Sequence, residues 1–175
     1  MVVVGYKPYR RKVVARVCVV DDKGRVVMDR YVRPDEPVTM YKTGWSGICA
    51  HHLEDAPGFA EVQAEVIALL NGHILVGHCL HFDLKVLQLH HDPDLVRDTG
   101  CYPPLMLTQA PTWRALPRSL RSLASEYLGL TIQTGAHSPV DDARAAMSLY
   151  QLHQKEWESC LSSGTMHLLE APLKV

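Results

Sequence analysis

Hydrophobic and polar positions follow two different periods along the chain, and these divide it into strand-like and helix-like segments. Residues 1–5 form a very short apolar run, and residues 12–34 contain two Val-rich runs around a polar turn at 21–24. Two apolar runs separated by a short Gly-containing turn are typical of a β-hairpin. Pro34 and Pro37 then end the second strand, because proline cannot donate to a sheet ladder.

Helical spacing begins after this hairpin. Residues 56–70 have apolar side chains three and four positions apart, and Gly72 follows as the expected C-cap. A short apolar strand is expected at 73–78, a helix starting in the segment 82–90, and another short strand at 95–99. This order of strand, helix and strand indicates a βαβ unit.

The C-terminal half is expected to contain two helices. Residues 100–117 are rich in proline, which predicts a loop or irregular lid. Helical spacing returns at 119–130 and in a long last helix at 138–160. A hairpin followed by alternating strands and helices predicts an α/β domain with a mixed sheet. We expect this domain to span residues 1–160, followed by a C-terminal tail at 161–175.

Composition narrows the range of partners. A length of 175 residues suits one domain, and a net charge of -1 argues against nucleic-acid binding over the whole surface, although a local basic patch is compatible with it. The five cysteines are scattered and form no C-x-x-C pair, which favours an intracellular, reduced chain. No apolar run reaches membrane-spanning length, so we expect no membrane partner.

One stretch, residues 135–151, combines a histidine with two aspartates at the start of the last helix. Ser138 is a suitable N-cap, and Asp141 then falls at the third helical position, where it can act in a capping box. Asp142 points in a different direction and has no such structural role. His137 lies just before the helix, where a loop can aim its ring past the helix end. A capped helix with a surface histidine is the competing interpretation.

Spacing alone does not decide between these interpretations, because His78 and Asp83 repeat the same separation. His78 ends a predicted strand and Asp83 opens a predicted helix, which is where ligands bind in α/β sheets. Asp83 could simply favour the helix dipole. Alternatively, Asp83 and Asp142 could bind a divalent cation such as Mg²⁺, which prefers carboxylate and phosphate oxygens. A neutral His137 could then accept a proton from an attacking water.

Two motifs in the sequence resemble those of a known enzyme family. "HILVGHCLHFDLKVL" at 73–87 and "HSPVDDARAAMSLY" at 137–150 resemble the second and third motifs of DEDDh 3′–5′ exonucleases, relatives of ribonuclease T. Other blocks, among them "VTMYKTGWSGI", "LVRDTGCYPPLM" and "YQLHQKEWES", are similar to the RNA exonuclease 4 group and the interferon-stimulated 20 kDa exonucleases. These blocks fall in the same order at similar spacing from about residue 1 to residue 160.

The resemblance implies a ribonuclease-H-like mixed sheet flanked by helices, and two divalent ions, Mg²⁺ or Mn²⁺. It implies cleavage at the 3′ end of single-stranded RNA, with DNA as a second possibility, and a nuclear or nucleolar role in processing ribosomal RNA. Asp83 and Asp142 would be metal ligands, and His137 the general base. The substrate-binding residues implied are Trp45, Ser46, Gly47, His78 and Leu80. We also expect Trp45 to pack on the core.

The family's first motif, Asp-Cys-Glu-Met, is incomplete in this sequence. "MVVVG" resembles the part that begins at the Met, so the Asp and Glu would precede Met1, and the first acidic residue present is Asp21. We therefore expect a truncated central strand and too few carboxylates for two ions. A start codon placed too late and a short isoform are favoured over a degenerate descendant. The competing function is a non-catalytic nucleic-acid-binding or scaffold protein with the same fold.

A second candidate feature is the basic, aromatic segment at residues 6–12. Its tyrosines, lysines and arginines could contact phosphates and stack a base. A solvated loop without function is the alternative.

Overall fold

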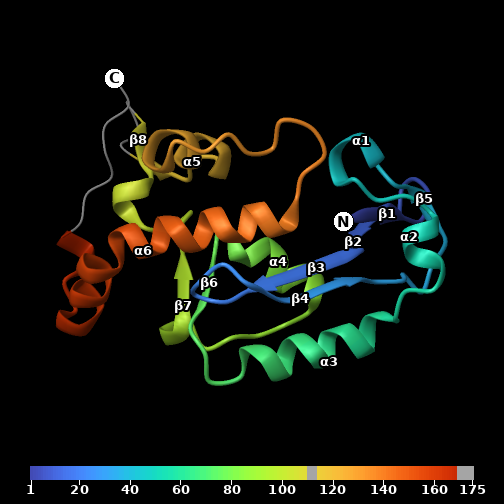
Figure 1. Ribbon diagram of the computed structural model, residues 1–175, viewed down its shortest axis with the longest axis horizontal. Helices are drawn as coiled ribbons and strands as arrows, with labels where there is room; N and C mark the ends of the chain where they lie inside the picture. The colour runs from blue at the N-terminus through green and yellow to red at the C-terminus, as the bar shows by residue number, and fades with distance from the viewer. Residues whose placement is uncertain (110–113, 169–175) are drawn as a thin grey trace.

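The computed structural model describes residues 1–109 and 114–168 (Figure 1). Helix α6 (Pro139–Ser163) packs against strands β3 (Arg16–Val20) and β6 (Leu75–Gly77). Helix α3 (Phe59–Leu70) lies on the opposite side of the hairpin that β3 forms with β4 (Val26–Tyr31). Strands with helices on both sides confirm the predicted α/β class.

The N-terminal part is built from two antiparallel units. Strand β3 pairs with β4 (Val26–Tyr31) as the predicted hairpin, and Asp21 holds its turn by accepting hydrogen bonds from the backbone of Lys23 and Arg25. The first Val-rich run is not one strand, however. Its beginning forms a separate strand in a second sheet, which consists of β2 (Arg11–Val13), β1 (Val2–Val4) and β5 (Val38–Met40).

Two one-turn helices, α1 (Thr43–Ser46) and α2 (His51–Glu54), connect this sheet to α3. Asn71 caps α3, and the expected Gly72 follows it with a φ of +71°. Strands β6 and β7 (Val96–Asp98) are parallel and are joined through α4 (Leu80–Leu87), which confirms the βαβ unit. The chain enters β7 from a 3₁₀ turn at Pro93–Leu95.

The expectation of a loop or irregular lid at residues 100–117 is wrong for half of that segment. It contains a 3₁₀ turn at Pro103–Leu105 and a short hairpin of β8 (Leu107–Gln109) and β9 (Arg114–Leu116); residues 110–113 lie outside the described part. Tyr102 is 1% exposed and Leu105 is fully buried, so the segment is anchored in the core. Pro103 and Pro104 occupy the start of this 3₁₀ turn, where no backbone donor is needed.

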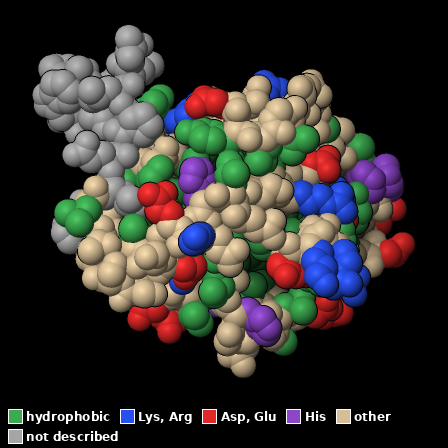
Figure 2. All heavy atoms as spheres, turned by 60° about the vertical axis from the view of Figure 1, so that its left-hand side comes forward, with side chains coloured by type: hydrophobic (Ala, Val, Ile, Leu, Met, Phe, Trp, Pro, Cys, Tyr) green, Lys and Arg blue, Asp and Glu red, His purple; other side chains and the backbone are tan. Residues whose placement is uncertain are grey.

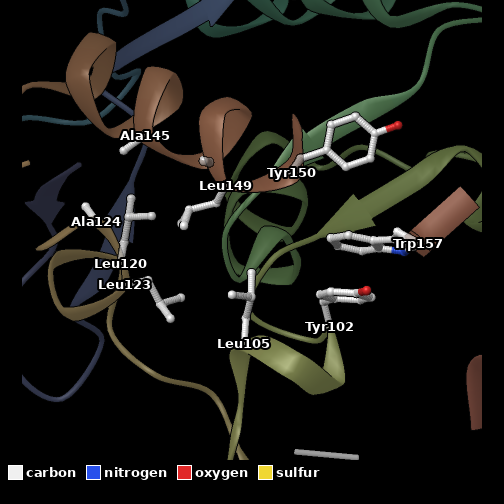
Figure 3. Packing of buried hydrophobic residues seen from close by; sticks show 10 residues of the cluster. Tyr102, Leu105, Leu120, Leu123, Ala124, Ala145, Leu149, Tyr150 and Trp157 are labelled. Atoms are coloured by element: carbon white, nitrogen blue, oxygen red, sulfur yellow. The ribbon is translucent and has the colours of Figure 1, made fainter. Parts of the chain in front are cut away.

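The main core lies between α5 (Leu120–Leu128), α6 and the 3₁₀ turn at Pro103–Leu105 (Figure 3). The rings of Tyr102 and Trp157 stack with centroids 4.0 Å apart, and Leu123 and Leu149 are fully buried in the same cluster. Helix α6 continues beyond the expected end at residue 160 to Ser163, and a 3₁₀ turn at Met166–Leu168 follows. The division into a domain and a tail at that point stays a prediction.

The described strands do not form one continuous sheet. Among the described residues, β3 pairs with β4 alone, and β6 pairs with β7 alone. An inner cavity of about 550 Å³ is lined by residues of β3, β6, α4 and α6. Strand β1 has three residues and lies between β2 and β5, and the expected truncation of the first strand stays a prediction. None of the described helices is both long and apolar enough to cross a membrane.

Candidate active site

A cleft of about 460 Å³ lies where β1 and β2 meet α1, α4 and the start of α6. It is lined by Asp83, His137 and Asp142, which are far apart in the sequence. Trp45 and Ser46 line the same cleft. The fold therefore brings together the three proposed catalytic residues and part of the proposed substrate-binding segment.

The start of α6 separates the two aspartates as the sequence predicts. Ser138 is the N-cap, and its hydroxyl accepts a hydrogen bond from the Asp141 backbone at 3.3 Å. The Asp141 side chain is exposed, whereas Asp142 is half-buried and accepts a 2.9 Å hydrogen bond from Gln133 Nε2. Burial raises the pKa of Asp142, and the Gln133 bond opposes this shift. Asp142 is thus the aspartate fixed at the cleft.

His137 is held by α1. Its backbone N–H donates to the Trp45 carbonyl at 2.8 Å, and the two rings stack with centroids 4.7 Å apart. His137 Nδ1 lies 3.9 Å from Asp142 Oδ2, within reach of a small adjustment or a bridging water. The ring is therefore positioned from two directions, at the edge of the cleft.

The expectation that Trp45 packs on the core is wrong, because its side chain is 68% exposed. Ile48, three residues later, is 2% exposed and takes the core position instead. The Ser46 hydroxyl donates to the Tyr41 carbonyl and accepts from the Ile48 backbone, so it stabilises this turn. Gly47 caps α1 with a φ of +68°, a conformation that favours glycine.

Asp83 lies in the first turn of α4, which begins directly after β6. Asp98, at the end of β7, fixes that helix start by accepting hydrogen bonds from the backbones of Cys79 at 2.7 Å and Leu80 at 2.9 Å. Partial desolvation by the surrounding protein raises the pKa of Asp83 to about 6, and the Asp98 charge adds to the shift, although the residue keeps an exposed surface. The Met1 amino group and His81 oppose it.

Sequence reasoning missed Asp98 and Gln133. A signal existed for Asp98, because the carboxyl ends of parallel strands meet at one edge of a sheet and β6 and β7 end side by side. No comparable signal marks Gln133, a loop residue with a φ of +58°.

His78 and Leu80 lie deeper than the cleft and line the inner cavity, together with Asp83 and Asp142. His78 Nδ1 contacts the Thr99 hydroxyl at 3.0 Å. Burial lowers the pKa of His78, which favours the neutral imidazole. Leu80 is 7% exposed, so it shapes the cavity wall.

Positive charge surrounds the cleft. Lys12, Arg16 and Lys42 all line it. The Arg16 guanidinium is occupied by Asp29, at 2.8 and 2.7 Å. Lys12 and Lys42 make no ion pair with any described residue. Two lysines of this kind suit the phosphates of a polyanion.

The residues present do not fit a two-ion metal centre. Within the described ranges, no three His, Cys, Asp or Glu side chains lie close enough together to hold an ion. Asp83 and Asp142 supply two carboxylates, and His137 one imidazole. Two Mg²⁺ or Mn²⁺ ions require more charged oxygens than this set provides.

The sequence pattern of the Exonuclease family, RNase_T, matches residues 5–150, which include all three proposed catalytic residues. The chain belongs to the exonuclease family. RNA exonuclease 4 of Cryptococcus neoformans is 49% identical to this exonuclease-family chain over 144 residues, covering 82% of this chain and 34% of that protein. RNA exonuclease 4 of Homo sapiens is 46% identical over 158 residues, covering 90% of this chain and 36% of that protein. The chain thus spans about a third of the length of these curated relatives.

Solved structures give the same assignment of fold. The Saccharomyces cerevisiae Pan2 pseudoubiquitin hydrolase-RNA exonuclease module, in complex with A7 RNA, superposes with a TM-score of 0.73 at 29% identity, covering 98% of this chain and 31% of that one. The Neurospora crassa Pan2 catalytic unit superposes with a TM-score of 0.72 at 26% identity, covering 94% of this chain and 27% of that one. The exonuclease-family chain therefore has the ribonuclease-H-like fold that the resemblance implied.

Proposed function

We propose that this chain carries the site of a metal-dependent exonuclease that releases nucleotides from the 3′ end of RNA, with a metal-ligand set that is incomplete in the chain as it stands. The observation that carries the proposal is the meeting of Asp83, His137 and Asp142 in one cleft that Lys12 and Lys42 also line. The Pan2 module solved with RNA supports RNA as the substrate, and DNA is the competing one. Processing of ribosomal RNA in the nucleus or nucleolus is the proposed setting, on the resemblance alone.

Each residue has a distinct proposed task. Lys12 and Lys42 attract the phosphate chain into the cleft. His137, stacked on Trp45, accepts the proton of the attacking water, a task that contributes roughly 10²–10⁴-fold in rate. Asp83 and Asp142 would supply two of the ligands of a divalent cation, whose chemistry is to stabilise the charged oxygens of the scissile phosphate. The two carboxylates of the family's first motif would complete that site.

The incomplete ligand set favours a second candidate, a non-catalytic RNA-binding protein with the same fold. The two candidates differ in how the chain responds to added carboxylates. We define the extended chain as the 175 residues preceded by a short apolar segment that ends in Asp-Cys-Glu. Met1 lines the inner cavity together with residues of β3 and β6.

The test is degradation of a 5′-labelled single-stranded RNA with Mg²⁺, Mn²⁺ or EDTA. We expect the 175-residue chain to cleave slowly and the extended chain to produce a ladder that shortens from the 3′ end. EDTA abolishes this ladder, and a 3′-phosphate on the RNA delays it. An extended chain that binds RNA without cleaving it would establish the non-catalytic candidate.

A further inference from the structure

The N-terminal segment has a single sign of charge. Residues 1–20 contain no Asp or Glu and carry five cations, at Lys7, Arg10, Arg11, Lys12 and Arg16. Elsewhere the charges mix: on the face formed by the left-hand end of Figure 1, acidic and basic side chains lie next to one another (Figure 2). Arg11 pairs with Glu36 and Arg16 with Asp29, whereas Lys7 and Arg10 make no ion pair with a described residue.

Two tyrosines lie at the tip of the β1–β2 hairpin, next to these cations. The side chain of Tyr6 is 76% exposed and that of Tyr9 is 84% exposed. Neither ring stacks on another aromatic ring or lies against a cation among the described residues. Rings exposed to this extent contribute little to the packing of the fold. Two exposed aromatic rings on one short turn are typical of a contact surface.

The tip is held in a defined conformation. The Tyr9 backbone donates to the Tyr6 carbonyl at 2.7 Å, which closes the turn. Thr39 Oγ1 on β5 donates to the Gly5 carbonyl at 2.9 Å. Gly5 has a φ of +74°, and a Cβ there would lie 2.8 Å from the Tyr9 carbonyl oxygen. The two rings are therefore displayed on a fixed turn, which lowers the entropic cost of binding a partner.

This tip is continuous with the active-site cleft. Lys12 pairs with Val3 across the hairpin, and both residues line the cleft. Tyr9 lies three residues before Lys12, at most ~10 Å away along an extended chain. Positive charge and exposed rings thus lead from the cleft to the tip of the hairpin.

We propose that residues 6–12, the hairpin surface, bind single-stranded RNA upstream of the 3′ end that lies in the cleft. Tyr6 and Tyr9 stack on unpaired bases, and Lys7, Arg10 and Lys12 contact phosphates. Stacking is tolerant of sequence because every base has an aromatic face, and basic side chains track the backbone. This inference rests on the proposed function, because it assigns the path of that substrate outside the cleft.

The test measures binding by fluorescence anisotropy in EDTA, with fluorescein-labelled oligouridylates of twelve and three nucleotides. The variants are Tyr6→Ala/Tyr9→Ala and Lys7→Ala/Arg10→Ala. The matched control is Leu152→Ala/Lys155→Ala, which removes an exposed apolar side chain and a cation from α6. A thermal melt accompanies each variant, and all are expected to melt as the unmodified chain does, because the substituted side chains are exposed.

We expect the tyrosine variant to weaken binding of the twelve-nucleotide RNA by roughly thirtyfold, the lower end of the range for loss of two stacked bases. Binding of the trinucleotide changes less than about twofold, because it reaches only the cleft. The Lys7 and Arg10 variant lowers the slope of log affinity against log salt by about 1.4, for two phosphate contacts on a single strand. The control variant leaves all of these quantities unchanged.

Unchanged binding of the long RNA by the tyrosine variant overturns the inference while the proposed function stands. An equal loss for the trinucleotide, or an equal loss in the control variant, also overturns it. A parent chain that binds neither RNA contradicts both the inference and the proposed function.

Discussion

Removal of the Asp98 carboxylate should destabilise the protein by an amount that its hydrogen bonds predict. Asp98 accepts three backbone hydrogen bonds, from Cys79 at 2.7 Å, Leu80 at 2.9 Å and Gly100 at 2.9 Å. Two of these donors belong to the start of α4, where backbone N–H groups have no helical partner. No other side chain among the described residues caps this helix end.

The expected cost of Asp98→Ala follows from those contacts. Loss of an N-terminal cap costs about 1 kcal/mol, and hydrogen bonds to a charged group contribute ~1.5–3 kcal/mol each when a buried donor is left unpaired. The three losses share one side chain and are not additive, so we expect a total of roughly 3 kcal/mol. For a chain of this size, that corresponds to a decrease in Tm of about 6–12 °C.

The assay is urea and thermal unfolding at pH 7.5, with Asp92→Ala as the matched control. Asp92 is a nearby aspartate that accepts one backbone hydrogen bond, from Asp94 at 3.0 Å, so its removal should cost about 1 kcal/mol or less. Asp98→Asn keeps one acceptor oxygen and should fall between the two. Equal costs for Asp98→Ala and Asp92→Ala would refute the reasoning, because three charge-assisted bonds would then contribute no more than one.

Three further outcomes follow from the structure. The pKa of Asp83 is raised to about 6, so its stabilising contribution is present at low pH and is lost as the pH rises through that value. In EDTA, Asp83→Asn should therefore raise the free energy of unfolding at pH 8 by roughly 1 kcal/mol after screening, and thermal melts should show this gain vanishing towards pH 4. The Arg97 guanidinium holds the pKa of Glu158 below its usual value. Glu158→Gln should therefore lower the free energy of unfolding by ~1–2 kcal/mol at pH 7. Unfolding titrations should show that the difference between this variant and the parent chain shrinks below about pH 4. Trp45→Ala should leave Tm unchanged, because the Trp45 side chain is exposed. It should slow single-turnover RNA cleavage by the extended chain roughly tenfold or more, because His137 loses the ring that positions it. Normal cleavage by this variant would show that the stack has no positioning role.

Local patterns were sufficient to predict most of the elements. The structure has the predicted hairpin, although only from Arg16 to Tyr31, and it has the predicted βαβ unit and the cap of α6. Residues 100–117 were misjudged because their order comes from tertiary contacts: Tyr102 and Leu105 insert into a core formed by α5 and α6. No local period reveals such anchoring.

In the candidate site, too, some residues could be predicted from local sequence and others depend on tertiary contacts. Asp142 could be distinguished from Asp141 because a helix fixes their relative directions, and the structure places Asp142 at the cleft and Asp141 on the surface. The exposure of Trp45 and the Gln133 contact depend on how loops distant in sequence meet. These contacts follow only once the fold is known.

The most direct measurement of the central claim compares the two neighbouring aspartates of α6. Single-turnover degradation of 5′-labelled RNA with Mg²⁺ is followed for the extended chain and for its Asp142→Asn and Asp141→Asn variants, with a thermal melt of each. The account predicts that Asp142→Asn abolishes 3′-end shortening, while Asp141→Asn cleaves within a few-fold of the parent and loses roughly 1 kcal/mol of stability or less. Normal cleavage by Asp142→Asn, or its loss in Asp141→Asn alone, would contradict the assignment of the catalytic site.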